Sequence, residues 1–170
     1  MLFLSSAGGE IVPELPEVET VRRGLEQAMV GRTVTEVILR RENLRFPFPK
    51  QFASRVAGRR IDSIRRRAKY LLIDLDDGQI LLSHLGMSGR YTLFDSNKVK
   101  QFNSTGNIDT VSRFGTATGF AGRHDHVEFR FDDESIAVYT DPRRFGIMDL
   151  IEVGEESIHP LLESLGPEPF

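Results

Sequence analysis

Three observations predict an α+β fold that is mainly β, an antiparallel β-sandwich of about eight strands flanked by helices near the two chain ends. Short runs rich in β-branched and aromatic residues recur between turn signals along most of the chain. Helical periodicity is found near the two ends, at 13–26 and 155–165. The sequence contains no internal repeats, so the strands belong to one sandwich.

The first helix is predicted from the stretch PELPEVETVRRGLE, residues 13–26. Val18, Val21 and Leu25 recur at i, i+3 and i+7, so one face of the helix can pack on a core. Pro16 lies near the first turn, and the acidic residues beside it complement the helix dipole. Periodicity alone therefore indicates an ordinary amphipathic helix.

The remaining elements follow from turn signals and β-branched runs. Strands are expected at 33–39, 61–64, 70–75, 79–85, 90–94, 126–131, 135–139 and 147–153. A short helix is expected at 50–57 and a last helix at 155–165. The segment 96–123 is rich in Gly, Ser, Thr and Asn without a clear period, which predicts a long mobile insertion loop.

Composition indicates a soluble globular protein of one domain, or of one domain and a fragment. The hydrophobic share of 39% and charged share of 28% in 170 residues are typical of that class. The chain has no apolar run long enough to span a membrane, and its first twelve residues make a poor signal peptide. The cysteine count of 0 excludes a disulfide framework and a thiolate metal site. We therefore expect a cytoplasmic protein with no membrane partner.

Charge is segregated along the chain. The net charge of −3 argues mildly against a nucleic-acid partner, but the distribution matters more. Basic residues gather in three clusters, formed by Arg59, Arg60, Arg65, Arg66, Arg67 and Lys69, by Arg40, Arg41 and Arg45, and by Arg143 and Arg144. Two explanations fit this pattern: one basic face of the folded molecule, or several separately solvated faces.

Four stretches in order resemble one family. They are PELPEVETVRRGLE at 13–26, RRAKYLL at 66–72, HLGMSG at 84–89 and HDHVEF…YTDPRRFG at 124–146, followed by LGPEP at 165–169. Together they resemble formamidopyrimidine-DNA glycosylase, the bacterial repair enzyme for oxidised purines. No single motif is specific, but an unrelated β-sandwich interaction protein would require all four to be coincidences. The resemblance covers 13–169, the N-terminal domain of that family.

The resemblance implies DNA base-excision repair by covalent catalysis. Members remove formamidopyrimidines and 8-oxoguanine as N-glycosylases, and then act as lyases on the abasic site through a Schiff base. Pro13 matches the nucleophile and Glu14 the general acid that assists sugar-ring opening. Lys69 matches the acid tied to base release and β-elimination, with a phosphate contact as its alternative. An α-amino group titrates near pH 8, so a neutral fraction is available to attack.

The resemblance also implies a group that enters the DNA stack. Flipping a base out of the duplex leaves a hole that inserted side chains fill. Met87, Arg143 and Phe145 match the family's inserted trio of thioether, guanidinium and aromatic wedge. In isolation, Met87 and Phe145 would be read as core residues. Their positions among turn-forming residues favour exposed loop tips instead.

Phosphate contacts are implied for a further set of side chains. His84, His124 and Arg143 resemble positions that contact DNA phosphates near the lesion, although a lone histidine is more often structural. Arg144 is expected to make a phosphate contact or a structural ion pair. None of these histidines has a spacing that indicates metal binding, so we expect no metal site in this chain.

Two departures from the family pattern affect the expected activity. Residues 1–12 precede the motif, and an internal proline nitrogen is an amide that cannot attack a sugar carbon. One hypothesis is a mis-assigned start: valine can be encoded by GTG, an alternative initiation codon, so initiation at Val12 and removal of the initiator would expose Pro13. The alternative is a retained leader, with which the chain cannot form the Schiff base. The family's helix-two-turn-helix and zinc-finger parts, which bind one zinc, are also missing from this sequence.

The expected partner is damaged double-stranded DNA, bound by a monomer associated with the bacterial nucleoid. We expect no cofactor in this chain, because the family's zinc lies in the missing finger. We also expect the catalytic activity of a chain of this length to be weak or lost. The alternative reading is a catalytically inactive DNA-binding remnant or pseudogene product.

Overall fold

The computed structural model describes the backbone of residues 14–95, 99–103, 108–111 and 122–165, and the side chains of 17–95 and 122–165. Strands form two antiparallel sheets, one of six strands in the order β1-β8-β9-β5-β6-β7 and one of four in the order β10-β4-β3-β2. The strands are β1 (Val34–Leu39), β2 (Ile61–Arg67), β3 (Tyr70–Leu75), β4 (Ile80–His84), β5 (Arg90–Phe94), β6 (Val99–Asn103), β7 (Ile108–Val111), β8 (Asp125–Phe131), β9 (Ile136–Thr140) and β10 (Ile147–Ile151). The predicted antiparallel two-sheet fold is therefore confirmed.

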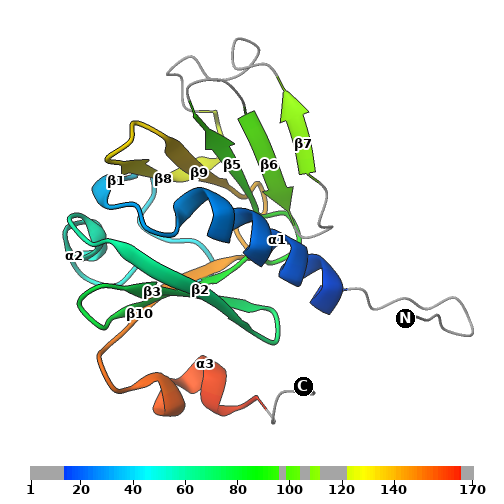
Figure 1. The fold of residues 1–170 in the computed structure, drawn as a ribbon. Coiled ribbons are helices and arrows are strands. Elements are labelled where there is room, and N and C mark those ends of the chain that lie inside the picture. Colours follow the sequence, from blue (N-terminus) through cyan, green and yellow to red (C-terminus); the bar gives the residue numbers. More distant parts are fainter. Residues whose placement is uncertain (1–13, 96–98, 104–107, 112–121, 166–170) are drawn as a thin grey trace, which may run out of the picture.

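Helices lie at both ends of the described chain and beside β1. They are α1 (Glu14–Met29), α2 (Phe52–Val56), a 3-10 turn η3 (Glu156–Ile158) and α3 (Pro160–Glu163). Figure 1 shows α1 lying between the two sheets, and it contacts β2 and β3 of one sheet and β6 of the other. None of the described helices is long and apolar enough to span a membrane.

Helix α1 buries the stripe that its sequence predicts. Val18, Val21, Leu25 and Met29 are all at most 6% exposed and belong to the main hydrophobic core. Beyond the helix end, the amide of Gly31 donates to the carbonyl of Ile61 at 2.8 Å, which ties this end to β2. The helix is therefore held along one face by apolar packing and at its C-terminal end by a backbone hydrogen bond.

The four-stranded sheet is buried on both faces. Successive residues of a strand point to opposite faces, yet Leu71, Leu72 and Ile73 are all at most 1% exposed. One face joins the main core, whereas Leu72 and Leu82 pack in a second cluster with Leu162 of α3. The C-terminal segment thus covers the outer face of this sheet, which explains why these strands lack a polar alternation.

The structure corrects the prediction for 96–123. Within it, 99–103 and 108–111 form β6 and β7, which extend the six-stranded sheet beyond β5. These strands form without an alternating apolar pattern because backbone pairing, for example of Tyr91 with Phe102, supplies their hydrogen bonds. The two additional strands raise the predicted eight to ten among the described residues.

The predicted last helix at 155–165 is also wrong in extent. The chain instead forms η3 followed by the short helix α3, which begins at Pro160. Proline disfavours helical backbone in the residue before it, and His159 accordingly is extended, with φ −65° and ψ 131°. The side chain of His159 accepts a hydrogen bond from the amide of Leu161 and so caps α3.

We predict that Leu25→Ala will lower the free energy of unfolding by about 2–5 kcal/mol, because it opens a cavity where α1 meets the core. Gln27→Ala, on the exposed face of the same helix, should change it by less than about 0.5 kcal/mol. Urea unfolding of both variants measures the difference. Equal effects would contradict the packing of α1 described above.

Candidate functional site

Two loops meet around one buried carboxylate. The loop after β4 carries Ser88, and the loop after β9 begins at Asp141, whose exposure is 0%. Asp141 Oδ1 accepts hydrogen bonds from Ser88 Oγ at 2.6 Å and the Arg144 amide at 3.0 Å. Its Oδ2 accepts from the Gly146 amide at 2.8 Å and Tyr139 Oη at 3.0 Å. The carboxylate therefore joins the two loops to each other and to β9.

The backbones of these loops approach too closely for side chains. A Cβ atom on Gly86 would lie 2.8 Å from the Gly146 amide nitrogen, and one on Gly146 would lie 1.9 Å from Tyr139 Oη. The amide of Arg143 also donates to Ser88 Oγ at 3.1 Å. Glycine is therefore required at both positions, and the loop tips are held in a fixed relation.

Three of the predicted DNA-contacting residues occupy these tips. Met87 is 70% exposed and Phe145 is 44% exposed, so neither belongs to the hydrophobic core. Arg143 is exposed, and its guanidinium carbon lies 4.7 Å from the centre of the Phe145 ring. The structure thus brings the three residues together on the surface, while their role in DNA remains a prediction.

Lys69 lies in the turn that leads into β3, and His84 ends the neighbouring strand β4 beside these loops. Lys69 is exposed in the turn between β2 and β3, and the rings of Tyr70 and His84 are 4.8 Å apart. His84 Nδ1 accepts a hydrogen bond from the Gly86 amide at 2.9 Å. Burial lowers the pKa of His84, and the charges of Lys69 and Arg45 lower it further. A neutral imidazole is therefore favoured, with its proton on Nε2, where it can be donated.

The structure adds Arg45, which the sequence-based site did not include. Its amide donates to the carbonyl of Gly146 at 3.1 Å, which joins the segment after β1 to the loop of Arg143. Arg45 also lies over the ring of Phe46, 5.5 Å from its centre. The position of Arg45 in a basic cluster of the sequence indicated a site residue only weakly, because it is the fold that brings Arg45 beside His84 and the Phe145 loop.

The other two predicted contact residues flank the Asp141 loop. His124 is partly exposed, and its carbonyl accepts a hydrogen bond from the Asp141 amide at 3.0 Å. Arg144 Nη1 donates a hydrogen bond to the side-chain amide oxygen of Asn43 at 3.0 Å, while its predicted phosphate contact or ion pair stays a prediction. The buried His126, which sequence reasoning left out of the site, supports the loop through Nε2 and the Asp141 carbonyl at 2.8 Å.

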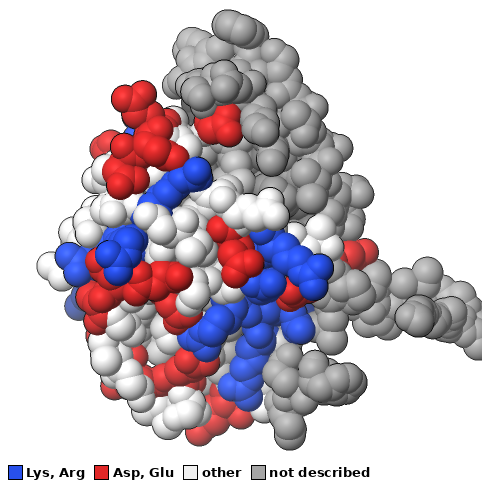
Figure 2. Space-filling model, in the orientation of Figure 1, with Lys and Arg blue, Asp and Glu red and all other residues white. Residues whose placement is uncertain are grey.

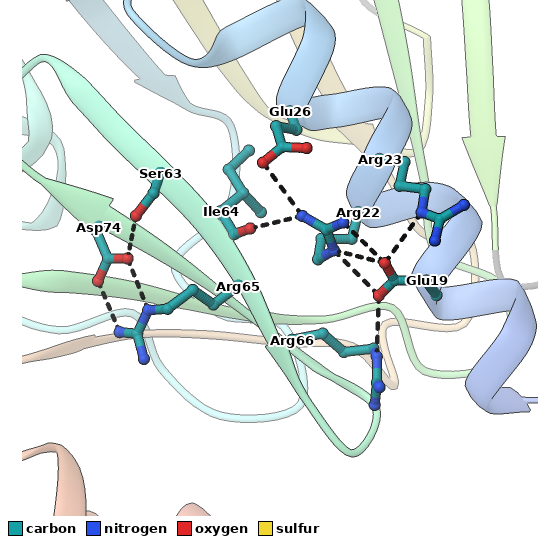
Figure 3. Close-up of polar contacts among 9 residues, drawn as sticks. All are labelled: Glu19, Arg22, Arg23, Glu26, Ser63, Ile64, Arg65, Arg66 and Asp74. Atoms are coloured by element: carbon teal, nitrogen blue, oxygen red, sulfur yellow. Dashed lines mark hydrogen bonds and ion pairs between the residues drawn. The ribbon is translucent and has the colours of Figure 1, made fainter. Parts of the chain in front are cut away.

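The predicted catalytic pair at the start of α1 is described only in part. Pro13 lies outside the described residues, and Glu14 opens α1 with its side chain outside them. Further along the helix, Glu19 accepts hydrogen bonds from Arg22 at 2.8 Å and from Arg66 of β2 at 3.2 Å (Figure 3). Arg22, and then Arg66 and Arg23, lower the pKa of Glu19 to about 2. This carboxylate therefore fixes α1 to β2 as an anion.

Ion pairs with acidic side chains compensate much of the positive charge of the largest basic cluster of the sequence. Figure 2 shows Lys and Arg side chains gathered over α1 and β2 with Asp and Glu side chains beside them. Arg65 pairs with Asp74 at 2.7 Å and with Glu156 at 3.0 Å, and Arg60 pairs with Asp62 at 3.0 Å. The arginines of 59–67 are therefore largely compensated by acids of the same chain. In the part of the chain that the structure describes, no three His, Asp or Glu side chains gather where they could hold a metal.

Comparison with known proteins shows which family this chain resembles in sequence. A family model, the formamidopyrimidine-DNA glycosylase N-terminal domain, matches residues 12–148. Formamidopyrimidine-DNA glycosylase of Rhizobium leguminosarum bv. trifolii is 48% identical over 161 residues, covering 93% of this chain and 52% of that protein. The enzyme of Methylocella silvestris is 50% identical over 159 residues, covering 94% and 51%.

Solved structures agree with the sequence relatives. Lactococcus lactis Fpg in complex with DNA containing an abasic site superposes with a TM-score of 0.71 at 31% identity, covering 92% of this chain and 51% of that one. By class, this is the two-sheet N-terminal domain of a DNA glycosylase. The chain belongs to the formamidopyrimidine-DNA glycosylase family, as its four motifs predicted. It spans about half the length of the curated relatives it matches.

Replacing the buried carboxylate should disrupt the loop junction. We predict that Asp141→Asn will lower the free energy of unfolding by about 2–4 kcal/mol. The carboxylate accepts hydrogen bonds from four donors, and the NH₂ group of an asparagine would face two of these donors without being able to accept from them. Asp62→Asn, at an exposed ion pair, should cost less than about 1 kcal/mol. Thermal unfolding of the two variants provides the comparison, and similar stabilities would contradict the role given to Asp141.

The depressed pKa of Glu19 predicts a pH dependence. Its contribution to stability is complete above about pH 4.5, the ordinary value, and is lost as the pH falls toward about 2. Glu19→Gln should therefore reduce stability at pH 6 but flatten the loss of stability between pH 4.5 and 2. Urea unfolding at several pH values measures both effects. Parallel curves for the parent and the variant would show that the ion pairs of Glu19 contribute nothing.

Proposed function

We propose that this chain is the catalytic N-terminal domain of a base-excision repair enzyme. It removes oxidised purines, formamidopyrimidines and 8-oxoguanine, from double-stranded DNA and then cleaves the strand at the abasic site. The observation that supports this most directly is the exposed group of Met87, Arg143 and Phe145 beside the Lys69 turn, in a chain of this family.

The chemistry of the first step is nucleophilic substitution at the sugar. The amine nitrogen of Pro13 forms a bond to C1′ as the glycosidic bond breaks, and the bonding electrons leave with the base, which takes up a proton. Opening of the sugar ring, assisted by Glu14 as general acid, converts the adduct into an iminium. Lys69 acts as the acid tied to base release and β-elimination, which its exposure in the β2–β3 turn permits.

The surface loops perform the accompanying base flipping. Met87 and Phe145 enter the stack where the damaged base has left it, and Arg143 contacts the estranged base. This role is supported by the exposure of these side chains and by the hydrogen bonds of Ser88 that fix the two loops to each other. Side chains that unstack DNA must be held by a rigid backbone. The arrangement of Arg143 over Phe145 restricts both side chains before DNA binds.

Phosphate contacts orient the duplex around this wedge. His84, with Nδ1 already accepting from the Gly86 amide, donates Nε2–H to a phosphate, and His124 and Arg144 contact the backbone near the Asp141 loop. Arg45 adds a further cation beside His84. We place the protein in the bacterial cytoplasm on nucleoid DNA, acting as a monomer.

The proposal makes a sharp prediction about the nitrogen of Pro13. A chain that begins at Pro13 should form a covalent adduct with abasic-site DNA when borohydride is present, because hydride reduces the iminium to a stable amine. The chain with residues 1–12 attached is the matched control, since its Pro13 nitrogen is an amide and should give no adduct.

Gel electrophoresis and intact mass of the adduct measure the outcome, and tryptic mapping should place the sugar on Pro13. An adduct from both chains at another residue would refute the role of Pro13. Absence of any adduct from the Pro13 chain, with DNA binding retained, would favour a catalytically inactive DNA-binding module instead.

A further inference from the structure

One guanidinium links α1 to the turn that carries Lys69. Arg66 of β2 donates from Nε to Glu19 Oε1 at 3.2 Å, and from Nη1 to the carbonyl oxygen of Ala68 at 3.1 Å. Ala68 has φ 52°, a left-handed conformation that a residue other than glycine adopts at a cost. The bond from Arg66 therefore stabilises the unusual backbone immediately before Lys69.

The other end of this link reaches the start of α1. Glu19 lies five residues after Glu14, which is about 7.5 Å along a helix axis, so it belongs to the part of α1 nearest Pro13. Arg22 also bonds to Glu19 at 2.8 Å and donates from Nη1 to the carbonyl of Ile64 at 3.0 Å (Figure 3). The Glu19 carboxylate thus holds the front of α1 against β2 through two arginines.

We propose that Glu19 and Arg66 are positioning residues for the reaction, setting the catalytic end of α1 relative to Lys69. Neither residue is assigned a contact with the sugar or the base. Their function is to keep the start of α1, which begins at Glu14, and the turn that carries Lys69 in one arrangement. This inference rests on the function proposed above.

The positioning role of Arg66 requires a guanidinium that donates two hydrogen bonds in different directions. Arg66 donates through different nitrogens of one rigid plane to a carboxylate on α1 and to a carbonyl of its own turn. A lysine at this position keeps the charge but presents a single ammonium that cannot reproduce the fork. Arg66→Lys therefore keeps any attraction to DNA phosphates but removes the two hydrogen bonds that position α1 relative to the Lys69 turn.

The neighbouring ion pair supplies a matched control. Arg65 on the same strand bonds to Asp74 through Nε and Nη2, both at 2.7 Å, and Ser63 adds a hydrogen bond to Asp74 at 2.5 Å (Figure 3). This pair connects β2 to β3 without contacting α1 or the carbonyl of Ala68. Arg65→Lys and Asp74→Asn thus remove the same chemistry from the same strand.

The experiment uses chains that begin at Pro13 and measures single-turnover rates at saturating DNA. Arg66→Lys and Glu19→Gln should slow base release and strand cleavage about tenfold or more, with the Kd for DNA within about twofold of the parent. The double variant should be no slower than the slower single variant, because both remove one link. Arg65→Lys and Asp74→Asn should remain within about twofold of the parent rates.

Two results would overturn the inference. Parental rates for Arg66→Lys would show that only the charge matters. A loss confined to the Kd would assign Arg66 to a phosphate contact.

Hydrogen exchange tests the link without relying on activity. Arg66→Lys should speed amide exchange at residues 68–70 and in the first turns of α1, whereas Arg65→Lys should not. Unchanged exchange at these segments would overturn the inference. A parent chain that fails to form the borohydride adduct would instead refute the proposed function, so the two failures are distinguishable.

Discussion

The buried carboxylate of Asp141 is the interaction on which the candidate site depends. It accepts four hydrogen bonds, two from side chains and two from backbone amides, on a residue that water does not reach. Burial and the neighbouring Asp141 raise the pKa of Tyr139, so its phenol remains a donor to the carboxylate. A buried anion is tolerable only when it is satisfied in this way. The loops that provide the donors are therefore held in one arrangement.

A second carboxylate performs the corresponding task for α1. Glu19 is only partly buried, so its ion pairs with Arg22 and Arg66 are more exposed to solvent than the hydrogen bonds of Asp141. It holds a helix whose position is already decided by the burial of Val21 and Leu25. The apolar stripe thus decides where α1 lies, and the ion pairs refine how its front end meets β2. Lys69 lies in the turn that Arg66 supports through its hydrogen bond to the Ala68 carbonyl.

The charge pattern has a consequence for DNA binding. Much of the basic cluster at 59–67 is neutralised within the chain, because Arg60 and Arg65 pair with acids on the same or adjacent strands. The cations near the loops, Arg45, Arg143 and Arg144, come from two separate segments of sequence. Under the proposed function, we therefore expect attraction to DNA phosphate at the loops of Arg45 and Arg143 rather than along the most basic stretch of sequence.

The sequence by itself determined the two-sheet class, the stripe of α1, most strand positions and the family, because periodicity, turn residues and short motifs are local features. It did not indicate β6 and β7, which form strands because β6 pairs with the backbone edge of β5 and β7 pairs with β6. It also left Asp141, Tyr139 and Arg45 out of the site, and it gave no reason to join Glu19 to Arg66 across 47 positions. The contacts of Asp141 with Ser88 and of Glu19 with Arg66 were decided by tertiary structure alone, because they join residues that are distant in sequence.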